Sequence, residues 1–491
     1  MYESAIGTTE DGTLDPLRTF QMVYVTLQHQ IFETLVTIDF NTQRIVPVLA
    51  ERWEQRDSLT IRFYLRRGVR FHNAEPFTAE AVVFTLNLMR DPRNKFGGRF
   101  LFDAIAAVQI VDPYTVDIIL SAPDALLLRK LAAVGFIFPP KYYTSVGDGY
   151  FTRYPIGTGP FRFFYNTKNK NNIREIHLVA NEDYWGDRPA IQELIYEFIP
   201  PDAHGQALRS GMIDMVITQD TRLKNELAND PKLTAFVQPS LRSAVCLINI
   251  DKQSPLQDIR VRRALEHCID RTKIITTILH GNGIPLYTIA PQGSLAHSRN
   301  KPLYPESIKR ARELLAESGY AHGLALKAMA ADNAPSKALA HALAEQLSHV
   351  GVDLSLEFLS REGIKKEVVE PKLMGNNKPS SYDLWIINGW PDLFGASAHF
   401  YFLFFHPHGI FNFGIYLDKT SPFEQYYNRA LASPNETALA KRLQQLDRLI
   451  MTEAVAIPIY QVALTYGMNK RIRFQPGLND LPLRFKECSI E

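Results

Sequence analysis

Strand-like and helix-like stretches alternate along the whole of this 491-residue chain. Residues 60–65 place Thr, Arg and Tyr alternately with Ile, Phe and Leu, which is the period of a strand with one buried face. Residues 307–317 and 436–452 instead repeat their apolar positions at helical spacing. Because the two kinds of segment are interleaved, the sequence predicts a mixed α/β architecture.

The same periodicities assign individual elements. Gly68 favours a turn into a second short strand over 69–72, and Thr78 is a suitable N-cap for the helix that follows. We expect further strands over residues 116–120, 193–199, 244–250, 354–358, 384–387 and 457–460. We expect helices over residues 181–185, 307–317, 338–349 and 436–452.

Composition narrows the classes of function. The 54 Lys and Arg residues nearly balance the 52 Asp and Glu residues, so no basic surface for nucleic acid is indicated. The longest apolar-looking run, 132–140, is far shorter than the ~20 residues that a bilayer-spanning helix needs. We therefore expect a soluble protein of two or three domains that does not bind nucleic acid.

Three cysteines, Cys246, Cys268 and Cys488, lie far apart without a Cys-x-x-Cys spacing. This argues against a zinc site and against a disulfide framework, although one bridge between Cys246 and Cys268 stays open. The chain begins without a charged segment followed by an apolar one, so we expect no signal peptide in it.

The segment 45–90 carries an ordered set of short motifs: a Pro-x-Leu-Ala start at Pro47, a tryptophan at Trp53, an Arg-x-Gly-Val-x-Phe-His turn over 66–72, and Pro-Phe-Thr-Ala-Glu over 76–80. This order resembles the signature of the extracytoplasmic solute-binding proteins of ABC importers, family 5, which includes oligopeptide-, dipeptide- and nickel-binding members.

Further segments continue this resemblance from about residue 8 to about residue 468. They are IGTGPFRF (156–163), NEDYWGDRPAIQELIYEFIPP (181–201), LRSGMIDM (208–215), DIRVRRALEHCIDRTKII (258–275), IKRARELLAESGY (308–320) and the strand 382–390. The glycine-rich GTGP loop lacks the Gly-Lys-Ser/Thr of a phosphate-binding loop, and Pro160 removes a backbone donor. We therefore interpret it as a structural turn.

The resemblance implies a type II periplasmic-binding-protein fold: two lobes joined by two hinge strands, with an extra inserted domain. Carried onto this chain, the first lobe comprises 1–40, 156–243 and 456–491, the inserted domain 41–155, and the second lobe 244–455. The crossings between lobes fall near 239–244 and 454–460. Closure of the hinge around a ligand is the motion expected of such an architecture.

The resemblance also implies a function and a location. The chain would be the substrate-binding component of an ABC importer, capturing a peptide or peptide-like small solute without a cofactor. It would act as a monomer and pass the ligand to the permease transmembrane subunits and their ATPases. It would be periplasmic or lipid-anchored on the outer face of the cytoplasmic membrane, after removal of a leader.

A candidate ligand site lies in INGWPDLFGASAHF (387–400). In peptide-binding members an aspartate after a Gly-Trp strand end pairs with the ligand ammonium, and Asp392, after Trp390, takes that place here. A buried ammonium needs a carboxylate to offset its desolvation, and an aromatic wall adds cation–π attraction. The spacing of two residues, where the family commonly has three, and the following Leu393-Phe394-Gly395 depart from the pattern. Asp392 could instead cap a turn after Pro391.

Arginines are candidates for the opposite end of a zwitterionic ligand. Arg242, in PSLRS, could make a two-pronged contact with a carboxylate or could instead pair the two lobes. Arg361 and Arg99 are weaker candidates, and each is also compatible with a solvated surface position.

Aromatic residues supply candidate walls for the site. By resemblance, Phe20 and Tyr24 begin a helix that lines the cleft, and Tyr460 lies at the second hinge. Other candidates follow Asp392 in sequence: Phe394, His399 and Phe402, the last two being one helical turn apart. Such a stripe is equally typical of a hydrophobic core.

Two histidines raise the possibility of a different ligand. His406 and His408, in FFHPHG, could contact a nickel or other metal chelate, but two histidines without a third donor nearby are a weak metal signal, so no metal site is predicted. The resemblance also leaves open an opine-like conjugate as ligand, or a role as the ligand-sensing module of a transcription regulator. We expect no enzyme, because no Gly-x-Ser-x-Gly, His-Glu-x-x-His or nucleotide motif occurs.

Overall fold

The computed structural model describes residues 13–19, 22–39, 41–94, 96–168, 173–251, 253–299, 302–375, 380–415, 417, 422–477 and 485–491. Strands and helices are interleaved through these residues, which confirms the predicted mixed α/β architecture. None of the helices in this described part is long and apolar enough to cross a membrane.

A seven-stranded sheet is the largest in the described structure, with the order β10-β16-β11-β15-β13-β14 and β12 paired to β16. Strand β13 runs parallel to β14 and β15, and the other pairs are antiparallel. The strands are β10 (Met215–Thr218), β11 (Leu233–Ile248), β12 (Gly283–Pro285), β13 (Leu324–Ala331), β14 (Val352–Leu359), β15 (Leu384–Pro391) and β16 (Ala456–Asn469).

Most of the smaller sheets are formed by strands from the N-terminal half of the chain. Their orders are β1-β2, β3-β4-β6-β5 and β7-β8-β9, and β17 pairs with β18 near the C-terminus. The strands are β1 (Val36–Ile38), β2 (Ile45–Pro47), β3 (Ala50–Gln55), β4 (Thr60–Leu65), β5 (Ile105–Asp112), β6 (Thr115–Leu120), β7 (Phe161–Lys168), β8 (Arg174–Ala180), β9 (Glu193–Glu197), β17 (Ile472–Arg473) and β18 (Ser489–Ile490).

Helices cover the sheets on both sides of the molecule. They are α1 (Met22–Ile31), α2 (Ala79–Arg90), α3 (Leu127–Val134), α4 (Pro140–Val146), α5 (Asp148–Arg153), α6 (His204–Arg209), α7 (Leu223–Leu227), α8 (Ile259–His267), α9 (Arg271–Leu279), α10 (Ile308–Glu317), α11 (Ala334–Ser348), α12 (Arg361–Ile364), α13 (Glu370–Leu373), α14 (Ala398–Phe405), α15 (Phe423–Leu431) and α16 (Glu436–Thr452). A short 3₁₀ turn, η2 (Arg99–Phe102), precedes β5.

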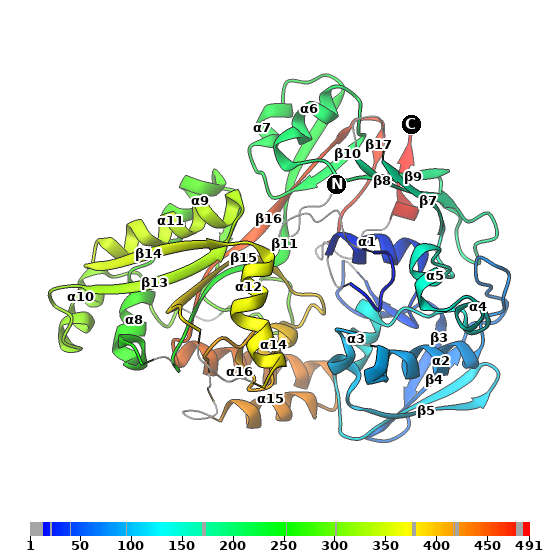
Figure 1. Ribbon diagram of the computed structural model, residues 1–491, viewed down its shortest axis with the longest axis horizontal. Coiled ribbons are helices and arrows are strands. Elements are labelled where there is room, and N and C mark those ends of the chain that lie inside the picture. Colours follow the sequence, from blue (N-terminus) through cyan, green and yellow to red (C-terminus); the bar gives the residue numbers. More distant parts are fainter. Residues whose placement is uncertain are drawn as a thin grey trace.

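The elements gather into two groups that β11 and β16 connect (Figure 1). Helices α1 to α5 and their small sheets lie on one side of the view, and α8 to α16 with β13 to β15 lie on the other. Helix α3 approaches α14, α15 and α16 where the two groups meet. The backbone N–H of Ala125 donates to the carbonyl of Leu431 (2.8 Å) across this meeting point.

Helix α16 illustrates why these segments fold as predicted. Leu439, Leu443, Leu446 and Ile450 are buried and recur at the spacing of one helical face. The side chain of Asn435 caps the helix by accepting from the N–H of Ala438 (2.9 Å). Its bounds match the prediction, and α10, β6, β14 and β15 also fall on predicted segments.

Two predicted elements are wrong. Residues 181–185 form a turn rather than a helix, because Tyr184 and Trp185 donate to the buried carboxylate of Glu33 (2.7 and 2.8 Å) and are held outside helical geometry. Residues 69–72 form no strand and make only an isolated bridge between Arg70 and Pro76.

Strand β11 begins at Leu233, well before the predicted start at residue 244, and it contains Pro239. Proline cannot donate to a ladder, so within sheets it is confined to edges and irregular positions. Here the pairing of β11 with β16 shifts register between Pro239 and Ser243, so the strand continues through an irregularity.

All three cysteines are free and buried, so the disulfide left open between Cys246 and Cys268 is not formed. Burial raises the pKa of both thiols, to about 12 for Cys268, and keeps them protonated at neutral pH.

Candidate ligand site

Two predicted ligand residues, Arg242 and Asp392, are brought together by the pairing of β11 with β15. Arg242 lies opposite Pro391 in the ladder, and the N–H of Asp392 donates to the carbonyl of Leu241 (2.7 Å). Both side chains are buried. The backbone segments that carry a buried arginine and a buried aspartate therefore lie side by side at the end of β15, where β11 also changes register with β16.

The guanidinium of Arg242 is completely buried. Burial lowers its pKa to about 9, and nearby Tyr466 opposes this shift. Desolvating a cation is costly, and the cost falls when an anion or strong acceptors lie beside it. A ligand carboxylate beside this guanidinium would therefore lower the cost of its burial.

The carboxylate of Asp392 holds the turn that begins α14. Its Oδ1 accepts from the N–H of Ala396 (3.1 Å), and its Oδ2 accepts from the N–H (2.7 Å) and hydroxyl (3.0 Å) of Ser397. These are the contacts expected if Asp392 caps a turn after Pro391. Oδ1 accepts one of these three hydrogen bonds. Because a carboxylate oxygen has two lone pairs, Oδ1 can accept a second hydrogen bond.

Trp390 forms part of an aromatic cluster behind this turn. Its ring packs edge-on against Phe404 (4.8 Å between centroids) and Phe411 (5.2 Å). Its indole Nε1 is buried and makes no hydrogen bond within the described structure. The cluster fixes the end of β15 through burial of aromatic surface.

His399, Phe394 and Phe402 face the opposite group of elements. The ring of His399 lies 5.0 Å from Phe394 and stacks at 6.3 Å on Phe100, from η2, which also stacks on Phe402 at 5.4 Å. Burial, helped by the charge of Lys130, lowers the pKa of His399 to about 3. The imidazole is therefore neutral at physiological pH, and its Nδ1 makes no hydrogen bond among the described residues.

The remaining predicted site residues are spread more widely. Tyr460, on β16, is buried and donates to Asn388 (3.0 Å). Arg99 is exposed and pairs with Asp103 (3.1 Å), and Arg361 is an exposed residue at the start of α12.

Tyr24, on α1, is buried and accepts from Arg174 (2.8 Å). It also packs on Phe198 (5.7 Å), and both of these contacts lie within its own side of the molecule. Phe20 lies outside the described residues.

His406 and His408 lie together at the end of α14. Their rings are 5.5 Å apart, and the N–H of His408 donates to Nδ1 of His406 (3.2 Å). Among the described residues, no group of three or more His, Cys, Asp or Glu side chains is placed to hold a metal ion.

The sequence matches the family model of the bacterial extracellular solute-binding proteins, family 5, over residues 44–411. This match covers well over half of the chain. The protein belongs to this family.

Relatives and solved structures extend the likeness beyond the matched region. Heme-binding protein A of Haemophilus influenzae is 26% identical over 89% of this chain and 82% of its own length. Probable di/tripeptide-binding protein 5 of Pseudomonas aeruginosa is 30% identical, over 58% of each chain. The structure of NikA from Brucella suis in complex with Fe(III)-EDTA superposes with a TM-score of 0.85 and 22% identity over 98% of both chains. This family 5 protein therefore has the family's two-lobed fold.

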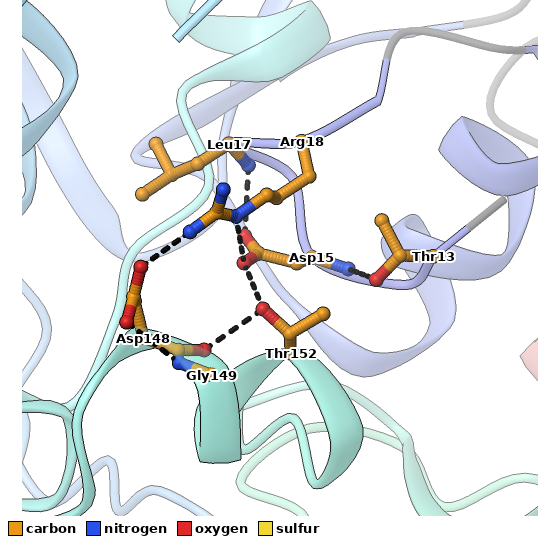
Figure 2. Close-up of polar contacts among 7 residues, drawn as sticks. All are labelled: Thr13, Asp15, Leu17, Arg18, Asp148, Gly149 and Thr152. Atoms are coloured by element: carbon orange, nitrogen blue, oxygen red, sulfur yellow. Dashed lines mark hydrogen bonds and ion pairs between the residues drawn. The ribbon is translucent and has the colours of Figure 1, made fainter. Parts of the chain in front are cut away.

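Polar side chains of the N-terminal segment contact α5 in this family 5 protein (Figure 2). Asp15 is fully buried, accepts from the N–H of Leu17 (2.9 Å), and its Oδ2 accepts from the hydroxyl of Thr152 on α5 (2.7 Å). Arg18 pairs with Asp148 at the protein surface. Burial raises the pKa of Asp15, and the Thr152 hydrogen bond opposes this rise.

Sequence reasoning missed two charged residues that border the site. Arg129 is buried within α3 and contacts the loop after Asp392, and Asp447, on α16, accepts from the hydroxyl of Tyr401 (2.7 Å). Each is a charge within an apolar helical stripe, and that pattern was the available signal.

Proposed function

We propose that this family 5 protein is the substrate-binding component of an ABC importer and captures a peptide or peptide-like zwitterion in the cleft between its lobes. It is then a binding protein rather than an enzyme. The observation that carries the proposal is the pairing, at the end of β15, of the two segments that carry the buried side chains of Arg242 and Asp392. A relative named for di- and tripeptide binding supports the same ligand class.

The ligand's two charged ends fit these two residues. Oδ1 of Asp392 has acceptor capacity left for an ammonium group. The planar guanidinium of Arg242 suits the two oxygens of a carboxylate. Trp390, Phe394 and Phe402 lie near Asp392 in sequence, and we propose that they cover the ligand's apolar parts when it is bound.

Closure is proposed to occur where β11 and β16 pass between the two groups of elements. The register shift between Pro239 and Ser243 interrupts the regular ladder there, which supports bending. The lobes are then 1–40, 156–243 and 456–491 for the first, with 41–155 inserted, and 244–455 for the second.

The remaining assignments follow from the importer function. A family of extracellular solute-binding proteins implies a periplasmic or membrane-anchored position, outside the cytoplasmic membrane. The protein would act as a monomer and present the closed form to permease transmembrane subunits, whose ATPases drive transport.

Native mass spectrometry of the purified protein, followed by denaturation, tests the ligand class. Released peptides would support the proposal and give the ligand's length. An empty protein that also gains no thermal stability from pools of di-, tri- and oligopeptides would contradict peptide binding.

A metal chelate is the second candidate ligand, and His399 favours it. Its imidazole is neutral because burial lowers its pKa to about 3, and neutral imidazole is the metal-binding form. Its Nδ1 makes no hydrogen bond among the described residues. Calorimetry with nickel–histidine and Fe(III)-EDTA, compared between the native protein and His399→Phe, separates this ligand from a peptide. A response of the native protein alone would favour the chelate.

A further inference from the structure

Arg129 lies where the two groups of elements meet and is among the largest fully buried side chains. It donates through Nη1 to the carbonyl of Phe394 (2.9 Å) and through Nη2 to the carbonyl of Gln43 (2.8 Å). Nη2 also pairs with the carboxylate of Glu436, at the start of α16. One guanidinium therefore joins three segments that are far apart in sequence.

These contacts lie on opposite sides of the proposed cleft. Arg129 and Gln43 belong to the proposed inserted domain, whereas Phe394 and Glu436 belong to the proposed second lobe. Phe394 is two residues after Asp392, so Arg129 holds the same loop that carries the proposed ammonium-binding carboxylate. The stacking of Phe100 on His399 and Phe402 crosses the same boundary.

The backbone of the loop is shaped to admit Arg129. Gly395 has φ +59°, and a Cβ on it would approach Oε1 of Gln43 to 2.9 Å and Nη1 of Arg129 to 3.2 Å. Any side chain here would push against the guanidinium and is also disfavoured by the left-handed backbone conformation. Glycine at position 395 therefore allows the loop to pack against the guanidinium of Arg129.

We propose that Arg129 is the positioning residue that clasps the closed lobes and fixes the Asp392 loop for ligand binding. This inference rests on the proposed function, because closure matters when a ligand is captured. In the clasp, two acceptors from the second lobe and one from the inserted domain replace the water that solvates the guanidinium in an open form. The clasp thus sets how much of the protein is closed before ligand arrives.

The closed population controls apparent affinity. When only a fraction of the protein is in the binding-competent state, the apparent Kd rises by the inverse of that fraction. Removing the clasp lowers this fraction, so the ligand must also drive the closure that Arg129 supplies in the native protein. Arg129 acts through the loop and the lobes and makes no direct contact with ligand in this proposal.

The test measures closure directly, in protein freed of ligand by unfolding and refolding. Spin labels on cysteines introduced at the exposed positions Gln109, on β5, and Gln445, on α16, report the distance between the two sides. The native sequence at position 129 is expected to give one narrow distribution. Arg129→Met is expected to broaden it and shift it to longer distances, and superimposable distributions would overturn the proposal.

Three further variants separate the clasp from a general role in folding. Glu436→Gln changes a half-exposed partner, so the fold is retained, and it should produce part of the same shift. Arg129→Lys keeps the charge but lacks the planar fork, and should lie between the native protein and Arg129→Met. Arg93→Met is the matched control: it removes an exposed arginine of the proposed inserted domain that pairs with Asp91, two residues away. An equal shift in this control would also overturn the proposal.

Binding of tri-L-alanine provides the second readout. If the native protein binds tri-L-alanine, Arg129→Met should raise the apparent Kd about tenfold, as expected for a tenfold drop in the closed fraction. If the native protein does not bind tri-L-alanine, this result counts against peptide binding as the proposed function. The distance measurement still decides the role of Arg129. An unchanged Kd in Arg129→Met would contradict the clasp.

Discussion

At the residue scale, the turn-holding contacts of Asp392 are compatible with its proposed role in ligand binding. Asp392 holds the turn before α14 through the N–H groups of Ala396 and Ser397, and it keeps acceptor capacity on Oδ1. A carboxylate fixed in this way is preorganised for a cation, because its orientation does not have to be set at the moment of binding.

Asp392→Ala is expected to weaken peptide binding by ~2–5 kcal/mol, because the ligand ammonium would be buried without a carboxylate. Calorimetry measures this loss. Asp392→Asn is the more conservative variant: its amide oxygen can still accept from the N–H and hydroxyl of Ser397, while the bond from the N–H of Ala396 and the charge are lost. Affinity that survives both substitutions would remove Asp392 from the site.

The pH dependence of stability should reveal His399. Its pKa is about 3 in the folded chain and about 6.5 unfolded, so between these values the unfolded chain binds a proton that the folded chain does not. Stability is therefore lost as pH falls from about 6.5 toward 3, by at most about 1.4 kcal/mol per pH unit. His399→Phe keeps the stacking on Phe100 and should remove this loss.

Urea titrations at pH 7, 6, 5 and 4 measure the effect as a difference between the two proteins. His72 and His204, whose pKa values burial also lowers to about 4, remain in both and cancel. His322→Gln, at an exposed position, is the control and should follow the native protein. Parallel curves for His399→Phe and the native protein would show that His399 becomes protonated in the fold.

At the element scale, the sequence predicted segments with a clear period and missed those set by tertiary contacts. The stripe of Leu439, Leu443 and Leu446 was enough to predict α16. The turn at 181–185 depends on hydrogen bonds to Glu33, about 150 residues away, which no local pattern contains. The N-terminal turn before α1 likewise depends on a distant element, α5.

Thr152→Val tests that link between the N-terminal turn and α5. It removes the hydroxyl that donates to Oδ2 of the buried Asp15, so part of the carboxylate loses its partner. We expect a loss of about 1–3 kcal/mol in the free energy of unfolding, measured by urea denaturation. Thr144→Val, at an exposed position on α4, should change stability by less than about 0.5 kcal/mol. Equal effects of the two would refute the link.

At the scale of the whole molecule, the resemblance predicted the two-lobed fold and placed Arg242 and Asp392 in segments that the structure brings together. It did not predict Arg129 or Asp447, because the contacts of both are with residues far away in the sequence. Arg129 is buried by contacts between the two sides of the molecule, whereas Asp447 is buried within its own side, where it accepts from Tyr401.

A ligand held between the lobes should slow amide hydrogen exchange in both lobes. At a ligand concentration of about one hundred times the Kd, the bound state is favoured by about 2.7 kcal/mol, so amide exchange that requires opening should slow about a hundredfold. Hydrogen–deuterium exchange should show this in residues 99–102 and in residues 392–397, because the stacking of Phe100 on His399 places these segments on the two sides of the proposed cleft. Helix α10, at the far edge of its side in Figure 1, is the internal control and should not change. Protection confined to one of the two segments would mean that the ligand binds one lobe alone, and closure would then have no part in capture.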